Sequence, residues 1–216
     1  MKKIFLIFMM LVLFLGACGS KKEGYISKQE TSTLEYNSDD ETNSEGNSSD
    51  EINKSSDEGL KSLVVYFSWS GNTENVAKSI QKETNSDIFE IIPSTPYSDD
   101  YESVVNVAKE EQKNNVRPQI ADTIENIEQY DIIYVGFPNW WGDMPMILYT
   151  FFDSYNLSDK TIAPFCTSGG SGLSNTINEI EKLEPDSIVT KGLHIDSESS
   201  SNPDEEVIEW LNDIER

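Results

Sequence analysis

The stretch VVYFSWSGNTENVAKSI, residues 64–80, decides the fold. A short apolar run, Val64–Phe67, is followed by a turn rich in hydroxyl groups and then by an amphipathic helical pattern. This order favours a phosphate pocket, because a helix N-terminus directs free backbone N–H groups and a partial positive charge at the turn. The candidate phosphate-binding residues are Ser68, Trp69, Ser70, Gly71, Asn72 and Thr73.

The turn differs from the two common nucleotide loops. It lacks the Gly-Lys-Ser/Thr ending of an ATP or GTP loop, and it lacks the three spaced glycines of a dinucleotide fingerprint. A hydroxyl-rich loop without a cation suits one terminal phosphate monoester. The alternative is an ordinary helix N-cap, for which Thr73 alone would be sufficient.

Two later segments extend the pattern. Residues 136–145 read GFPNWWGDMP, and residues 164–172 read PFCTSGGSG. With residues 64–80, they resemble the flavodoxin-like family, in a subgroup with a Pro-x-Trp-Trp loop and a Thr-x-Gly-Gly-Ser-Gly loop. The resemblance covers roughly residues 61 to 216 and implies FMN as the cofactor, with its phosphate in the first loop.

The Pro-x-Trp-Trp loop supplies flat aromatic area, on which the isoalloxazine ring of a flavin stacks well. We expect one of Trp140 and Trp141 to lie against the flavin and the other to pack or to close its edge. The alternative is that both indoles are buried in a seam between a helix and the sheet. The cofactor-binding residues expected here are Pro138, Asn139, Trp140, Trp141 and Gly142.

The third loop offers small residues whose backbone N–H groups can bond the polar edge of the flavin and its ribityl chain. The residues expected to do so are Thr167, Ser168, Gly169, Gly170, Ser171 and Gly172. The alternative is a glycine-rich connector without a ligand. The family's usual flanking tyrosine is missing from this loop, so redox potentials do not carry over.

The N-terminal segment predicts membrane attachment. Residues 1–17 resemble a bacterial lipoprotein signal peptide, with Lys2 and Lys3 before the apolar run Ile4–Leu15, which is too short to span a bilayer. Cys18 is then the lipidated residue on the extracytoplasmic face, and a plain secretory signal is the alternative. Residues 18–60 are polar and acidic and predict a disordered tether.

Charge limits the partners. Residues 61–216 hold 28 acidic and 10 basic side chains, a formal net charge of −18. This argues against nucleic acid and favours a basic-surfaced redox protein or a small-molecule electron acceptor, although acidity can also serve solubility alone. With Cys18 lipidated, Cys166 has no partner and is expected to be a packed thiol, with a redox role as the alternative. No metal site is predicted.

The remaining pattern alternates strands and helices. The expected strands are Ser62–Phe67, Asp87–Ile92, Asp131–Phe137, Thr161–Cys166 and Ile188–Ile195. The expected helices are Glu74–Glu83, Asp99–Asn114, Met146–Tyr155, Leu173–Lys182 and Asp204–Ile214, with a short helical piece near Thr123–Gln129. They predict an α/β fold with a doubly wound, five-stranded parallel sheet of order 2-1-3-4-5, helices on both faces, and all three loops at one rim. The segment Ser94–Tyr101 could line a substrate space near that rim, or be a rigid turn.

Three functions remain open. The first is an electron carrier that works through bound FMN outside the membrane. The second is an NAD(P)H-dependent FMN reductase acting on quinones or similar acceptors. The third is a non-catalytic interaction lipoprotein. No residues resemble a general acid–base pair or an activated nucleophile, and the single histidine, His194, lies far in sequence from Ser68 and Ser70.

Overall fold

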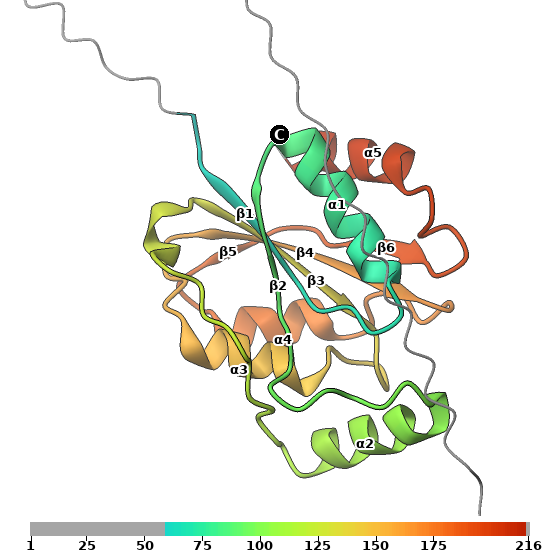
Figure 1. Ribbon diagram of the computed structural model, residues 1–216. Coiled ribbons are helices and arrows are strands. Elements are labelled where there is room, and N and C mark those ends of the chain that lie inside the picture. Colours follow the sequence, from blue (N-terminus) through green and yellow to red (C-terminus); the bar gives the residue numbers. More distant parts are fainter. Residues whose placement is uncertain (1–58, 215–216) are drawn as a thin grey trace, which may run out of the picture. The chain divides into compact units, whose positions relative to one another are not determined.

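The computed structural model describes residues 59–214, so the predicted signal peptide and Cys18 lie outside the described residues. Their centre is a parallel sheet of order β2-β1-β3-β4, with β5 and β6 both paired to β4 (Figure 1). The strands are β1 (Ser62–Tyr66), β2 (Asp87–Glu90), β3 (Ile132–Pro138), β4 (Thr161–Ser168), β5 (Ile188–Val189) and β6 (Leu193–Asp196). The predicted sheet order is confirmed.

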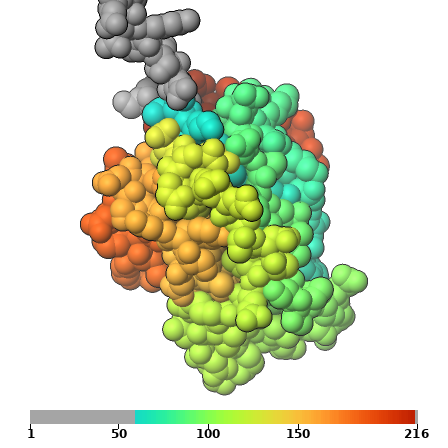
Figure 2. All heavy atoms as spheres, turned by 60° about the vertical axis from the view of Figure 1, so that its left-hand side comes forward, coloured from blue at the N-terminus to red at the C-terminus, as the bar shows by residue number. Residues whose placement is uncertain are grey.

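Helices cover both faces of the sheet, as predicted. Helices α1 (Asn72–Thr84) and α5 (Asp204–Ile214) lie on one face, and α3 (Met146–Ser154) and α4 (Thr176–Leu183) on the other (Figure 1). Helix α2 (Tyr101–Lys113) lies outside these two layers, and Figure 2 shows it as a protrusion at the opposite end of the molecule from residues 59–62. None of the helices in residues 59–214 is long and apolar enough to cross a bilayer.

Alternate residues of each central strand enter opposite cores. In β1, Leu63 and Val65 pack with α3 and α4, whereas Val64 and Tyr66 pack with α1 and α5. Strands buried on both faces are apolar throughout, because parallel crossovers place helices over each side. Residues 63–66 therefore form a continuous apolar run rather than an alternating one.

Helix α1 follows directly from the decisive stretch of sequence. Thr73, Val76, Ala77 and Ile80 are its buried face and repeat with helical spacing. The helix ends at Asn85, whose left-handed backbone (φ 53°) is a common way to stop a helix. The local pattern alone therefore positions the N-terminus of α1 against the end of β1.

The predicted fifth strand is wrong in one respect, because Ile188–Ile195 forms two strands instead of one. The carbonyl of Ile162 on β4 accepts the N–H of Thr190. The backbone N–H and C=O groups of every second residue of β4 therefore point toward the fifth strand. Pro164 is the next such residue after Ile162, and it has no N–H to donate. The ladder therefore stops after Thr190 and resumes where Phe165 pairs with Leu193.

Other boundaries differ by a few residues. Strands β3 and β4 continue through Pro138 and Ser168, so these predicted loop residues still belong to the sheet. The helical piece expected near Thr123–Gln129 is reduced to one 3-10 turn, Ile127–Gln129.

Gly136 on β3 is required by packing. It pairs with Phe165 on β4, and a Cβ at position 136 would lie 2.1 Å from Cζ of the Phe165 ring. Neither residue can move, since both lie in central strands and Phe165 is fully buried. The aromatic ring therefore fills the space that a side chain on residue 136 would need.

We expect Gly136→Ala to lower the free energy of unfolding by roughly 3 kcal/mol, because an added methyl group overpacks a core without free space. Urea denaturation followed by circular dichroism measures the change. Gly169→Ala is the matched control, since its Cβ would meet nothing within 4 Å. Phe165→Leu combined with Gly136→Ala should recover part of the loss, and equal stability of Gly136→Ala and wild type would contradict the packing argument.

Candidate functional site

The three loops predicted to share a rim meet at the carboxyl ends of β1, β3 and β4. The hydroxyl oxygens of Thr73 and Thr167 are 2.9 Å apart and join the first loop to the third. The N–H of Asn139 donates to the carbonyl of Thr167 at 2.9 Å and joins the second loop to the third. These bonds confirm that the predicted loops are brought together.

The first loop leaves the N-terminus of α1 open. Gly71 is the N-cap with φ 87°, and no side chain caps the helix. The hydroxyl of Ser68 accepts the N–H of Gly71 at 3.2 Å, while Ser70 is exposed. Uncapped N–H groups at a helix start form an anion site. The alternative in which Thr73 serves as the N-cap is wrong, because Thr73 lies inside the helix and its side chain is buried.

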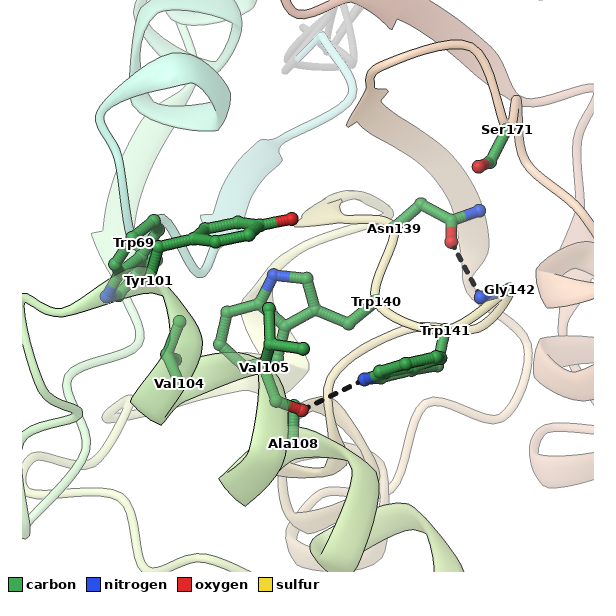
Figure 3. A pocket seen from close by; sticks show the side chains of 10 residues that line it. All are labelled: Trp69, Tyr101, Val104, Val105, Ala108, Asn139, Trp140, Trp141, Gly142 and Ser171. Carbon is green, nitrogen blue, oxygen red and sulfur yellow. Dashed lines mark hydrogen bonds between the residues drawn. The ribbon is translucent and has the colours of Figure 1, made fainter.

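Asn139 connects the second and third loops through its side-chain amide. The amide nitrogen donates to the carbonyl of Gly172 at 2.8 Å and to the hydroxyl of Ser174 at 2.9 Å. The amide oxygen accepts the N–H of Gly142 at 3.0 Å (Figure 3). One side chain thus fixes two loops relative to each other.

Trp141 and Gly142 form a tight turn with positive φ angles of 56° and 81°. Trp140 and Asp143 exchange backbone hydrogen bonds on either side of them, the pattern of a type I′ turn. A left-handed backbone costs a residue other than glycine about 1–2 kcal/mol. The indole N–H of Trp141 donates to the carbonyl of Val105 at 3.0 Å, and the amine of Lys109 lies 4.8 Å from its ring centre.

A pocket of about 330 Å³ lies beside these loops (Figure 3). Its volume falls in the range of small-molecule sites. Three tryptophans and a tyrosine are the aromatic residues of its lining. The lining residues are Trp69, Tyr101, Val104, Val105, Ala108, Asn139, Trp140, Trp141, Gly142 and Ser171.

Comparison with known proteins identifies the family. The flavodoxin family model matches residues 61–214. The chain belongs to the flavodoxin family. A candidate flavoprotein of Bacteroides uniformis is 32% identical with a TM-score of 0.62, over 71% of this chain and 99% of that one. A second, from Bacteroides eggerthii, is 31% identical with a TM-score of 0.61, over 73% and 99%.

A flavoprotein of Lactobacillus acidophilus, crystallised in complex with FMN, has the same fold. It is 23% identical with a TM-score of 0.58, over 73% of this chain and all of that one. The chain therefore has the fold of FMN-binding flavoproteins.

The two adjacent tryptophans of this flavodoxin-family protein have different surroundings. Trp140 packs edge-on against Phe67 and Tyr97, with ring centres 5.4 and 5.3 Å away, and presents its remaining surface to the pocket. Trp141 is 51% exposed at the rim. The alternative in which both indoles are buried in a seam is wrong, and stacking of one on a flavin remains a prediction.

Tyr97 packs against Trp140 and does not itself line the pocket. Its hydroxyl donates to the carboxylate of Glu111 at 2.9 Å. Burial raises the pKa of the Tyr97 hydroxyl, and it also raises the pKa of the Glu111 carboxyl. Within the segment Ser94–Tyr101, Tyr97 is therefore part of the packed support, and Tyr101 is the residue that lines the pocket.

Most of one wall of the pocket was missed in the sequence. Helix α2 contributes Tyr101, Val104, Val105 and Ala108, of which only Tyr101 belonged to a segment expected to line a substrate space. Only Val104 and Ala108 of this helix are buried, and their spacing of four residues marked the inward face. Trp69 was predicted with the phosphate loop, but its side chain lines the pocket and donates to the carbonyl of Ser98 at 2.9 Å.

The third loop supplies an irregular backbone. Gly169, Gly170 and Ser171 are exposed, and Gly170 and Gly172 have φ angles of 106° and 62°. Glycine adopts such angles without steric cost, so the loop can present backbone N–H groups outward. Thr167 and Ser168 are buried and hold the base of the loop.

Cys166 is a packed thiol, as expected, and not an exposed redox group. It is fully buried, and its sulfur donates to the carbonyl of Gly172 at 3.3 Å. Burial raises the pKa of the thiol to about 12. Within residues 59–214, no three His, Cys, Asp or Glu side chains are grouped to hold a metal ion.

We expect Cys166 in the folded protein to resist thiol reagents at pH 8. The raised pKa keeps the thiol protonated below about pH 12, and only the thiolate reacts. Native wild type and Cys166→Ala should therefore show the same number of fast-reacting thiols with Ellman's reagent, and differ by one in urea. An additional fast thiol in the native wild type would contradict this assignment.

Proposed function

We propose that this protein binds FMN and carries electrons through it. The observation that supports this most directly is the position of an aromatic pocket, lined by the three loops and by helix α2, beside an open helix N-terminus. FMN combines a flat ring with one phosphate monoester at the end of a short polyol. The pocket and the helix start match these two ends.

The residues present fit the cofactor. Ser70 and the first N–H groups of α1 offer neutral donors for the phosphate. Trp69, Trp140 and Trp141 offer aromatic surface for the ring. The N–H groups of residues 169–171 are available for its polar edge. When bound, FMN supplies one- or two-electron redox chemistry, and the protein binds and orients it.

Surface charge supports a particular class of partner. With a net charge of −18 over residues 61–216, the domain repels acidic proteins and attracts basic ones. A basic-surfaced redox protein is therefore the proposed partner, with a small-molecule acceptor as the alternative. The same negative field disfavours an anionic reduced flavin and lowers the reduction potential.

The proposed location follows from the N-terminal sequence. A lipid on Cys18 and the acidic tether of residues 18–60 would hold the domain at the extracytoplasmic face of the cell membrane. Anchoring through more than one acyl chain is stable rather than transient. Metabolic labelling with a palmitate analogue tests this assignment, and Cys18→Ser should abolish both labelling and membrane retention.

We expect full-length protein to bind FMN more tightly than riboflavin, with both affinities measured by quenching of flavin fluorescence. Ser70→Ala should weaken FMN binding about threefold to tenfold, the effect of one lost hydrogen bond, and leave riboflavin binding unchanged. Trp140→Leu should weaken both. Equal loss of both flavins in Ser70→Ala would contradict phosphate binding at the first loop, and no binding of either would contradict the proposed function.

We expect the FMN-loaded protein to be reduced quickly by dithionite and slowly by NADH or NADPH under anaerobic conditions. The described residues carry no dinucleotide phosphate loop beside the pocket. Stopped-flow absorbance at the flavin band measures both rates. Bleaching within milliseconds by either nicotinamide would instead support the reductase.

A further inference from the structure

Gly172 is the point at which the third loop is held. Its N–H donates to the hydroxyl of Ser168 at 3.0 Å. Its carbonyl accepts the side chains of Asn139 at 2.8 Å and Cys166 at 3.3 Å. Gly172 has a left-handed backbone, but glycine can adopt many other conformations as well. The hydrogen bonds of Gly172 therefore determine how the backbone of Gly169–Ser171 is oriented.

Ser168 in turn depends on His194 of β6. The Ser168 hydroxyl and Nε2 of His194 are 2.8 Å apart. A serine hydroxyl has one proton to donate, and Ser168 already accepts from Gly172. Because Ser168 is buried, its proton needs an acceptor, and Nε2 of His194 lies within hydrogen-bond distance to accept it.

The bonds form a continuous path across the rim. It runs from His194 on the edge strand through Ser168, Gly172 and Asn139 to Gly142 in the Trp141 turn. Removing the acceptor at one end leaves a buried hydroxyl unsatisfied. We expect the Ser168 side chain to change rotamer in search of another acceptor, which moves Oγ away from the N–H of Gly172.

We propose that His194 is a positioning residue for the flavin site. It holds the third loop through Ser168, so that the N–H groups of residues 169–171 are oriented toward the polar edge of the ring. This role rests on the proposed function, because the ligand it serves is FMN. His194 does not line the pocket, and it acts on the site through its hydrogen bond to Ser168.

The test compares two substitutions in the full-length protein. His194→Leu removes the acceptor and should raise the FMN dissociation rate about tenfold, since a buried unsatisfied hydroxyl costs that much. It should also alter the visible circular dichroism of bound flavin. His194→Gln keeps a side-chain acceptor and should restore the dissociation rate to within about twofold of wild type.

A double-mutant cycle tests whether His194 and Ser168 act on the loop through the same hydrogen bond. Ser168→Ala should match His194→Leu, and the double variant should be no worse than either, because both changes break the same bond. Ser79→Ala is the control, since Ser79 is also buried and its hydroxyl donates to the carboxylate of Asp204 at 2.6 Å. Neither Ser79 nor Asp204 lines the pocket. It should lower the melting temperature without changing flavin dissociation.

Hydrogen exchange separates this proposal from the proposed function. In protein without flavin, residues 168–174 should exchange faster in His194→Leu than in wild type or His194→Gln. If wild type binds no FMN but this pattern holds, the proposed function fails and the positioning of the loop stands. Unchanged exchange and dissociation in His194→Leu, or equal effects of Leu and Gln, would overturn the proposal.

Discussion

The structure depends on one row of residues across the middle of the sheet. In this row Tyr66, Gly136, Phe165 and Leu193 lie side by side on β1, β3, β4 and β6. The two large rings share one face, and Gly136 between them leaves the space that the Phe165 ring occupies. No other residue type fits the centre of this row, so the register of three parallel strands is fixed there.

Fixed register determines where the strands end, and their ends determine the site. Because β1, β3 and β4 are aligned, Thr73 and Asn139 lie close enough to Thr167 for each to bond to it. Few of these contacts are strong alone. Together they hold a tryptophan in a left-handed turn and a glycine-rich loop in one conformation, which is the pre-organisation that a rigid planar ligand requires.

Much of this could be predicted from the residues. The sheet order and the meeting of the loops followed from the order of strands and helices, because parallel strands place their carboxyl ends on one side. The division of the fifth strand was not predicted, although Pro164 was visible. Its effect depends on which neighbour the missing N–H would face, and this is known only once the strands are paired.

The wall formed by α2 was harder to anticipate. Its inward residues, Val104 and Ala108, look like those of any amphipathic helix, and only tertiary structure shows that they face a pocket as well as the core. Likewise, Thr73 and Trp69 belong to the same short motif, but one points into the protein and the other toward α2. The identity of these two residues alone did not show in which direction each side chain points.

Residues 59–61 precede the amino end of β1, and Trp69, which lines the pocket, follows the carboxyl end of the same strand. Five residues of β1 therefore separate residues 59–61 from the first loop, a distance of roughly 17 Å at 3.3 Å per residue. A force applied at Leu60 along the direction of β1 would be resisted in shear by the ladders to β2 and β3. The pocket lies at the other end of β1 from residues 59–61, so a partner that docks at the pocket does not meet those residues.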